Sequence, residues 1–435
     1  MIIRLYAVVL LLGLLSLSTS YSQDFSNKGK EFWLSYSYHV SMINTGGGLP
    51  QMTLYITSDV NTSYAVEIYG VTTLQSGAIV AGQVVTVTIP TSYFINDEGK
   101  FTNRTIRVTA DKPSVVYSYI TRSAISGATL CLPTNVLGKD YYSMSFTQVS
   151  NESNSNSYIT VIAVEDNTTI EVTPTANTKG GWLANQTYTV NLNKGEIYQV
   201  LGTTTGMTGV DLSGTRIRSV AGSSGGCKRI AVFSGSGKVR IPGSGCPSNS
   251  SDNLYQQLYP VGSWGKKFLT VPSYNRVNNY YRVIRSDPAT NVYVNGNLIP
   301  SGSFTNNYYQ FFNNTPNSIE ADKPISVTQY FTTENCDGNG SPYDPDMILL
   351  NPVEQNIDKV TLVSSNLVNG NQQHHIHVIM KNGGTGTSSF RIDGIVPIGN
   401  WVTHPGDPAY SYLYLNNVSQ GYHRLTSDSG FNAIV

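Results

Sequence analysis

DNLYQQLYPVGSWGKKFLTVP spans Asp252–Pro272 and joins two blocks of sequence that resemble each other. Its second half, GKKFLTVPS from Gly265, matches two earlier openings, GKEFWLSYS from Gly29 and GKDYYSMSF from Gly138. A weaker copy, DKVTLVSS, begins at Asp358. We therefore interpret Asp252–Pro272 as a boundary between copies of one unit, and the chain as a series of such units.

Each copy is rich in short β-strands. Runs of alternating apolar and polar residues recur between Gly, Asn, Asp or Pro, and β-branched and aromatic residues fill them, as half-buried strands require. Clear examples are MTLYITS (52–58), VVTVTIP (84–90), YITVIAV (158–164) and YRVIRS (281–286). No stretch of about 12 residues shows the apolar spacing of an amphipathic helix, so the sequence predicts an all-β fold.

The spacing of the openings sets the size of the unit. Roughly 100 residues with six or seven strands fit a sandwich-like unit of Ig-like size, whereas a single propeller blade needs only about 45. We predict four tandem sandwich-like repeats packed into one body, over residues 23–131, 132–250, 251–350 and 351–435. The alternative that stays open is a large closed arrangement of the propeller type.

The two ends of the sequence carry further expectations. Arg4 followed by an apolar run from Ala7 to Leu17 predicts a signal peptide over residues 1–22. That run is short for a membrane span, and no later stretch is apolar enough for one, so we expect a secreted or surface-held chain. The closing strand of the fourth unit stops at Val435, so we expect the natural product to continue beyond it.

The balance of charged residues limits the class of ligand that the chain can bind. The chain has 27 Lys and Arg against 27 Asp and Glu, and only 12% of its residues are charged. Nucleic acid is excluded as a partner, because binding to phosphates needs a basic excess. Polarity comes from Ser, Thr, Asn and 29 Tyr, which is typical of exported proteins that bind through hydrogen bonds and aromatic contacts.

Several short patterns resemble one known family. SDNLYQQLYPVGSWGKKFLTVP, the preceding IAVFSG, and VIAVEDNTTIEV with NLNKGEIYQV and DLSGTRIRS are similar to the IgGFc-binding protein N-terminal domain, here as a bacterial exported member. The resemblance runs over nearly the whole chain after residue 22. It implies an extracellular binding region, often one module of a longer adhesin-like protein, and it implies no contact residues for antibody Fc.

A cluster of oxygen-bearing side chains follows the third unit's closing strand. Asp337, Asn339, Asp344 and Asp346 are candidate calcium ligands, since calcium takes six to eight oxygens and often rigidifies loops of exported proteins. The EF-hand pattern fails here, and a plain turn-rich loop is the alternative. We expect no other cofactor.

Four cysteines in an exported chain favour disulfides over metal binding. Cys227 and Cys246 flank the closing strand of the second unit, and the glycines between them let the chain fold back, so we predict that they pair. A bond between Cys131 and Cys336 would require the first and third units to touch.

No catalytic constellation is present in the sequence. Gly222–Gly226 matches G-x-S-x-G, but a strand rather than a helix follows it, so a polar loop is the better interpretation. We predict no enzymatic activity and a binding or adhesion module for glycoprotein, polysaccharide or surface protein. The candidate ligand contacts are loop aromatics: Tyr274, Tyr280, Tyr281, Tyr308 and Tyr309. A carbohydrate-active enzyme or its accessory domain, and a structural spacer of an adhesin, are the alternatives.

Overall fold

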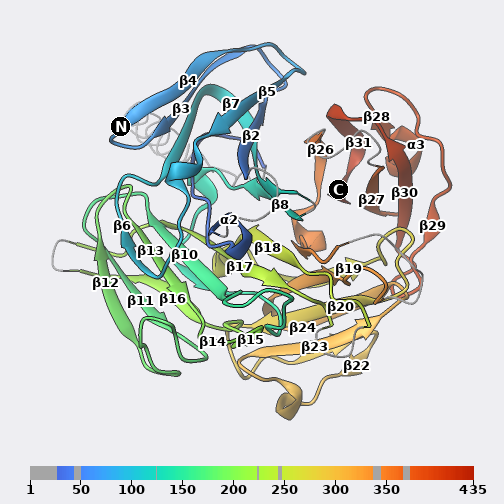
Figure 1. Ribbon diagram of the computed structural model, residues 1–435. Helices are drawn as coiled ribbons and strands as arrows, with labels where there is room; N and C mark the ends of the chain where they lie inside the picture. The colour runs from blue at the N-terminus through green and yellow to red at the C-terminus, as the bar shows by residue number, and fades with distance from the viewer. Residues whose placement is uncertain are drawn as a thin grey trace, which may run out of the picture.

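The computed structural model describes residues 27–43, 50–123, 125–222, 225–242, 247–336, 344–365 and 373–435. The predicted signal peptide therefore lies outside the described residues. The fold is all-β, and its strands form several sheets arranged around a common centre (Figure 1). For description we name four successive groups of strands units 1 to 4.

Unit 1 shows the strand order that the later units share. Its long strand β7 pairs with β1 and β3 along its first half and with β2 and β8 along its second half. The hairpin strand β4 pairs with β3, and β5 pairs with β2. The bounds are β1 (Gly29–Leu34), α2 (Val40–Ile43), β2 (Gln51–Thr57), β3 (Thr62–Ile68), β4 (Thr72–Ile79), β5 (Val84–Ile89), η1 (Thr91–Tyr93), β7 (Ile106–Arg122) and β8 (Ile125–Cys131).

Unit 2 has the same strand order, but two strands, β16 and β17, take the place of the single long strand. β16 pairs with β9 and β11, whereas β17 pairs with β10 and β18. The short strand β6 (Gly99–Phe101) belongs to unit 1 in the sequence but pairs with β13 of unit 2. The bounds are β9 (Asp140–Tyr142), β10 (Ser157–Ala163), β11 (Thr168–Thr173), β12 (Tyr188–Leu192), β13 (Ile197–Leu201), β14 (Thr204–Thr205), β15 (Thr208–Gly209), β16 (Arg216–Val220), β17 (Ile230–Val239) and β18 (Asp252–Gln257).

The strand β18 corrects one predicted boundary. The sequence interpretation places residue 251 at the start of the third unit, but β18 pairs with β17 and so completes the sheet of unit 2. The repeated Gly-Lys opening comes after β18 and the turn that follows it, at Gly265. The boundary between units 2 and 3 therefore lies in the 3₁₀ turn η3 (Val261–Ser263).

Unit 3 repeats the order of unit 1. Its long strand β24 pairs with β19 and β21 in its first half and with β20 and β25 in its second half. The bounds are β19 (Gly265–Thr270), β20 (Asn279–Arg285), β21 (Val292–Val294), β22 (Asn297–Leu298), η4 (Ser301–Ser303), β23 (Tyr308–Asn313), β24 (Asn317–Phe331) and β25 (Met347–Leu349).

Unit 4 has the same pairing around a long central strand, and its outer strands are arranged less regularly. Its long strand β31 pairs with β26 and β28 in its first half and with β27 in its second half, and β30 pairs with β27. The bounds are β26 (Ile357–Ser364), β27 (His374–Lys381), α3 (Gly386–Ser389), β28 (Arg391–Ile392), β29 (Val402–Thr403), β30 (Tyr410–Val418) and β31 (Gly421–Ile434).

The long strands bend where the sequence places proline. The segment ADKP occurs at 110–113 and at 321–324, and both copies are continuous with the strand on either side, in β7 and in β24. Pairing with β3 ends at Ala110 and pairing with β21 ends at Ala321, whereas pairing with β2 begins at Val115 and pairing with β20 begins at Ile325. Pro113 and Pro324 lie in the gap between them, where the missing backbone N–H costs no ladder hydrogen bond.

The glycine of each Gly-Lys opening has a packing role. A β-carbon on Gly29 would lie 2.1 Å from the β-carbon of Pro133, and the same contact recurs between Gly138 and Pro260 at 2.3 Å. Gly265 meets Pro352 in the same way, at 2.2 Å. Each of these prolines begins the 3₁₀ turn of the linker that leaves the unit: η2 (Thr134–Val136), η3 and η5 (Val353–Gln355). Only glycine lets the opening strand and the linker approach so closely.

In unit 4 the structure shifts the proposed alignment by one residue. Ile357 pairs with Phe431 before a bulge, as Gly29 pairs with Ser114 and Gly265 with Ile325. Ile357, rather than Asp358, therefore occupies the glycine position of this unit.

Unit 4 contacts unit 1, which closes the arrangement. The carboxylate of Asp59, in the turn between β2 and β3, accepts a hydrogen bond from Thr361 Oγ1 at 2.6 Å and one from Tyr422 OH at 3.3 Å. Lys28 contacts the same carboxylate, and the guanidinium of Arg424 lies 3.9 Å from it. A half-buried carboxylate thus links the first and last units.

We expect Asp59→Asn to weaken this closure. Burial alone would raise the pKa of Asp59, but the hydrogen bonds from Lys28 and Thr361 outweigh it and hold the pKa below its usual value. The stabilisation is therefore present above the unfolded pKa of about 3.9 and is lost as the pH falls below it. At pH 7 the variant should lose about 1–3 kcal/mol in the free energy of unfolding, measured by urea denaturation.

The control for this prediction is Asp111→Asn, which changes an exposed carboxylate of the same unit. The loss caused by Asp59→Asn should shrink as the pH is lowered from 5 to 3, because the protonated wild-type side chain also lacks its charge. A loss that is equal for both variants, or independent of pH, would contradict the assigned role.

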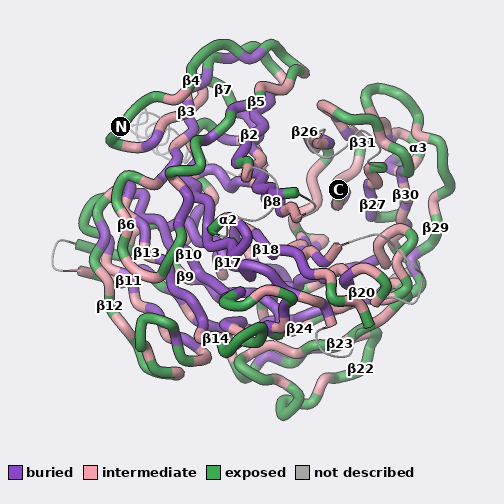
Figure 2. Tube along the Cα trace, viewed as in Figure 1, coloured by how far each residue is buried: buried purple, intermediate pink, exposed green. Residues whose placement is uncertain are grey.

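The distribution of buried residues follows the arrangement of the strands. Figure 2 shows buried residues concentrated on the strands that face the centre, such as β10, β17 and β18, and exposed residues on the outer hairpins. All ten residues of β17 and all seven of β10 are buried. The centre of the molecule is therefore closely packed.

Candidate functional site

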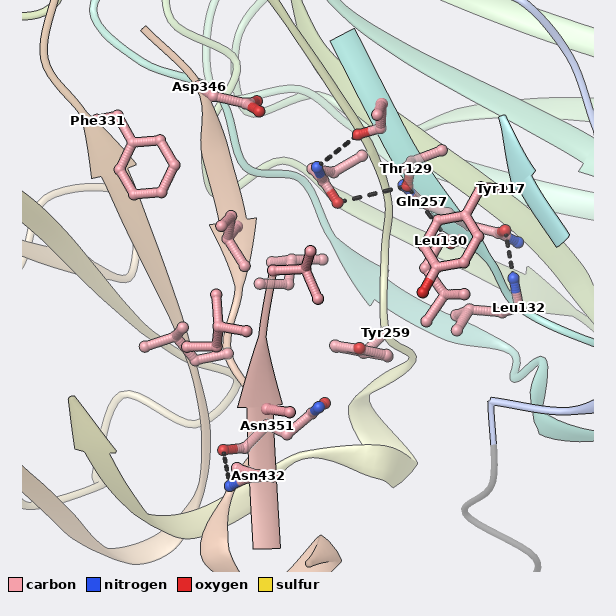
Figure 3. A pocket seen from close by; sticks show the side chains of 18 of the residues that line it. Tyr117, Thr129, Leu130, Leu132, Gln257, Tyr259, Phe331, Asp346, Asn351 and Asn432 are labelled. Atoms are coloured by element: carbon pink, nitrogen blue, oxygen red, sulfur yellow. Dashed lines mark hydrogen bonds between the residues drawn. The ribbon is translucent and has the colours of Figure 1, made fainter. Parts of the chain in front are cut away.

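A cavity of about 230 Å³ lies where the four units meet. Figure 3 shows side chains from distant parts of the chain converging on it, with Tyr117, Gln257, Asp346 and Asn432 coming from units 1, 2, 3 and 4 in turn. A smaller lobe of about 130 Å³ shares part of this lining. The residues common to both are Tyr117, Leu130, Leu132, Tyr259, Asn351, Asn432, Ala433 and Val435. We call the two together the central cavity.

One wall of the central cavity is held by side-chain amides. The strands β8 and β18 run side by side there, and side chains join them in place of a backbone ladder. Gln257 Oε1 accepts from the backbone N–H of Leu132 at 2.7 Å, and Gln256 Nε2 donates to Ala128 O at 3.0 Å. Gln257 Nε2 is buried and has no hydrogen-bond partner. The amides of this wall therefore serve mainly to bind unit 1 to unit 2.

Among the side chains that the structure describes, Asp346 carries the one carboxyl that lines the cavity. The side chain keeps some accessible surface, but it faces the cavity rather than open solvent (Figure 3). This burial raises the pKa of Asp346 to about 7. The hydrogen bond from Met347 N–H and the charge of Arg276 lower the pKa, but burial outweighs them. The buried Asp252 has a raised pKa as well, because of burial and the charge of Asp344.

We expect Asp346→Asn to change the pH dependence of stability. Because the folded pKa is raised from about 3.9 to about 7, the protonated form stabilises the fold, and stability is lost as the pH rises through this window. Asparagine is neutral and keeps an oxygen for Met347 N–H. The variant should gain about 2–4 kcal/mol relative to wild type between pH 4 and pH 8 in denaturant titrations.

Asp358→Asn, at an exposed carboxyl of unit 4, is the matched control and should leave the slope unchanged. Asp252 adds to the same trend, so Asp346→Asn should reduce the slope rather than abolish it. Parallel curves for wild type and Asp346→Asn across this range would show that the carboxyl is not desolvated.

A second recess opens to the surface between units 1 and 2, with a volume of about 620 Å³. It lies beside α2 on one face of the molecule, and we call it the inter-unit groove (Figure 1). Its lining is polar and mostly uncharged: Tyr38, Val40, Ile43, Asn96, Asp97, Ser153, Asn154, Asn156, Lys179, Thr203 and Thr204. The sequence analysis missed this site because its residues come from five separate segments of the chain. The one signal for it was the density of Asn and Ser near residues 151–157.

The predicted calcium ligands are only partly described. Asp337 and Asn339 lie outside the described residues. Asp344 accepts a hydrogen bond from Ser250 Oγ at 2.9 Å, and Asp346 accepts one from Met347 N–H at 2.7 Å. Over the residues that the structure covers, no three such side chains are grouped to hold a metal ion. Calcium binding stays a prediction for this loop.

The predicted aromatic contacts prove to be mainly structural. Residues 279–285 and 308–313 form the strands β20 and β23 rather than loops. Tyr281 is therefore fully buried and stacks on Phe311, so its predicted ligand contact is wrong. Tyr308 is half-buried over the guanidinium of Arg282, with 4.4 Å between the ring centre and Cζ.

Three of the predicted contact residues remain partly exposed to solvent: Tyr274, Tyr280 and Tyr309. Tyr274 stacks on His375 with ring centres 4.5 Å apart, and Tyr280 packs beside the exposed ring of Phe312. Tyr309 belongs to the ring cluster of β23. These rings lie apart from the inter-unit groove, and they stay candidate contacts.

The predicted cysteine pairing is wrong. Cys227 is a free, exposed thiol in the connection between β16 and β17, and Cys131 is free and buried. Cys336 is disulfide-bonded. Cys246 lies outside the described residues. The local hairpin fails because Cys227 lies before β17, and all ten residues of that strand separate it in sequence from Cys246.

A family comparison identifies the class of protein. The fold defines an all-β protein built from several sheets. The model of the IgGFc binding protein family matches residues 127–435, and the chain belongs to this family. The match covers units 2 to 4, whereas unit 1, with the same strand order, lies almost entirely outside it.

Neither the curated proteins nor the solved structures searched contain a match to this chain. In the described part of the chain, every helix is too short or too polar to cross a bilayer.

Proposed function

We propose that this protein is a secreted or cell-surface binding module, and that its ligand is an extracellular protein or glycoprotein. The family match over residues 127–435 is the observation that carries this proposal. The equal numbers of acidic and basic residues support it, because such a surface selects by shape and hydrogen bonding rather than by net charge.

The four units are, in this proposal, tandem copies of one sandwich-like unit. The recurring strand order and the repeated contact of an opening glycine with a linker proline support a common origin. Packing of four copies around one centre makes a rigid support, and rigid supports position binding loops well.

The ligand contacts the outer surface in this account. A protein ligand cannot enter a central cavity of about 230 Å³, since stable protein interfaces bury roughly 800 Å² on each partner. The outer loops, including the inter-unit groove, are the surfaces left for it.

We also propose that the module has no catalytic activity. The segment around Gly222 and Gly225 leads into the strand β17, whereas a nucleophile elbow leads into a helix. The three His side chains of β27 do not form a metal site either. His375 bonds Asn416 at 3.1 Å, and His377 accepts from Tyr274 N–H at 3.3 Å.

A panel of immobilised extracellular proteins and glycoproteins, including an antibody Fc fragment, tests the proposal. We expect saturable binding of the purified chain to at least one protein and no release of sugar or peptide fragments from any of them. Turnover would overturn the non-catalytic assignment. A complete lack of binding would leave the structural spacer as the better account.

A further inference from the structure

We propose that the inter-unit groove binds short neutral oligosaccharides, and that it does so as the glycan-recognising part of a glycoprotein-binding surface. This proposal rests on the proposed binding function and names a ligand class for it. The volume of about 620 Å³ lies within the range of about 300–1,000 Å³ that is typical of small-molecule sites.

The walls of the groove are held in place before any ligand binds. Tyr38 OH donates to Asn154 O at 2.7 Å, which ties unit 1 to unit 2 across the base. The buried Gln199 of β13 accepts from the backbone N–H of Tyr38 at 2.9 Å and donates to Asp97 O at 2.8 Å. Asn156, also buried, donates to Gly202 O at 2.6 Å. Because these loops are already ordered, a ligand loses little free energy in ordering them.

The groove carries no excess charge. Its charged side chains are Asp97 and Lys179, which form an ion pair at 2.7 Å. Burial would raise the pKa of Asp97, but the hydrogen bond from Lys179 outweighs it, and the carboxyl stays ionised at neutral pH. A ligand with phosphate, sulfate or sialic acid therefore finds no unpaired cation here, and a neutral ligand is favoured.

The remaining lining matches a sugar rather than a peptide. The side-chain amide of Asn96 and the hydroxyl of Thr203 line the groove, and both kinds of group bond sugar hydroxyls as donor and acceptor. Ile43, which is 43% exposed, offers an apolar surface to the C–H face of a ring.

Recognition of a peptide by strand addition needs unpaired backbone groups along an edge. Here the backbone N–H groups of Tyr38, Gly202 and Thr203 are already bonded within the protein. The groove walls therefore offer side chains to a ligand, and the geometry disfavours an extended peptide.

The test is a printed panel of neutral oligosaccharides built from mannose, galactose and N-acetylglucosamine, probed with the full chain. The panel also carries sialylated and sulfated versions of the same glycans and the peptides of the parent glycoproteins. The variants are Asn96→Ala and Thr203→Val, and the controls are Asn297→Ala and Thr189→Val on outer strands of units 3 and 2. Loss of one hydrogen bond should weaken binding about fivefold to tenfold in each groove variant and leave the controls unchanged.

Each other outcome decides against the proposal. Equal binding by wild type and groove variants would place the glycan site elsewhere. Preference for the charged glycans, or binding of peptides alone, would overturn the assigned ligand class. Undiminished binding to a glycoprotein after enzymatic removal of its glycans would overturn this inference but leave the proposed function intact. Absence of binding to any protein, glycoprotein or glycan would overturn both.

Discussion

Replacement of Arg282 by methionine should lower the free energy of unfolding by about 3–5 kcal/mol. Arg282 lies in β20, and its side chain is 1% exposed. Its Nη1 lies 2.8 Å from Ser145 O, 2.8 Å from Asp211 Oδ2 and 2.7 Å from Ser213 Oγ, all in unit 2. The substitution removes the donor that satisfies three acceptors at the contact between units 2 and 3.

Aromatic rings complete the surroundings of this guanidinium. Phe146 and Tyr308 lie 4.6 Å and 4.4 Å from its Cζ, measured to the ring centres. Burial would lower the pKa of Arg282, but the charge of Asp211 outweighs it and raises the pKa, so the side chain stays charged. Arg282→Lys keeps the charge but loses the planar set of donors, and it should cost a large part of the same free energy.

Arg218→Met is the matched control. Arg218 pairs with Glu171 on the surface of unit 2, with 45% of its side chain exposed. Exposed ion pairs contribute about 0–1 kcal/mol, so urea denaturation should show a small change for this variant. If Arg218→Met and Arg282→Met reduce stability equally, the buried network does not hold units 2 and 3 together.

Cys336→Ser should also destabilise the protein strongly. Cys336 is disulfide-bonded, whereas Cys131 and Cys227 are free. Cys246 is the remaining cysteine of the sequence, so we expect it to be the partner. Such a bond would close a loop of roughly 90 residues and stabilise the fold by about 4–5 kcal/mol if it is unstrained. It would also join units 2 and 3 covalently.

Non-reducing peptide mapping and thermal denaturation check this prediction. Cys227→Ser is the control, because its thiol is free and exposed, and it should leave the melting temperature unchanged. A map that links Cys336 to Cys131 or Cys227 would contradict the pairing. A melting temperature of Cys336→Ser equal to that of wild type would contradict the stabilising role.

Many of the strands could be predicted from sequence because they depend on local signals. Alternating apolar and polar residues report nearby backbone geometry, and the predicted runs 52–58, 84–90, 158–164 and 281–286 fall on the strands β2, β5, β10 and β20. The close contact of Gly29 with Pro133 explains why glycine recurs in the Gly-Lys openings, although it was not predicted. The match of the family model over residues 127–435 confirms the resemblance drawn from the short motifs.

The sites could not be predicted, because they depend on contacts between units. Asp59 has no local feature that distinguishes it from other turn aspartates, yet it accepts hydrogen bonds from Thr361 and Tyr422, which are 302 and 363 residues away in sequence. Tyr281 was assigned to a ligand-binding loop because Asn and Tyr surround it, but pairing with β24 turns it inward. The cysteine prediction failed similarly, since spacing along the chain does not report which units touch.

Hydrogen exchange of the full chain, free and bound to the tightest-binding glycoprotein of the panel, tests the central claim most directly. The account predicts slower exchange in the segments 96–97, 153–156 and 203–204 of the inter-unit groove, and unchanged exchange in β25 at the central cavity. Unchanged exchange in all three groove segments, with protection confined to another surface, would contradict it.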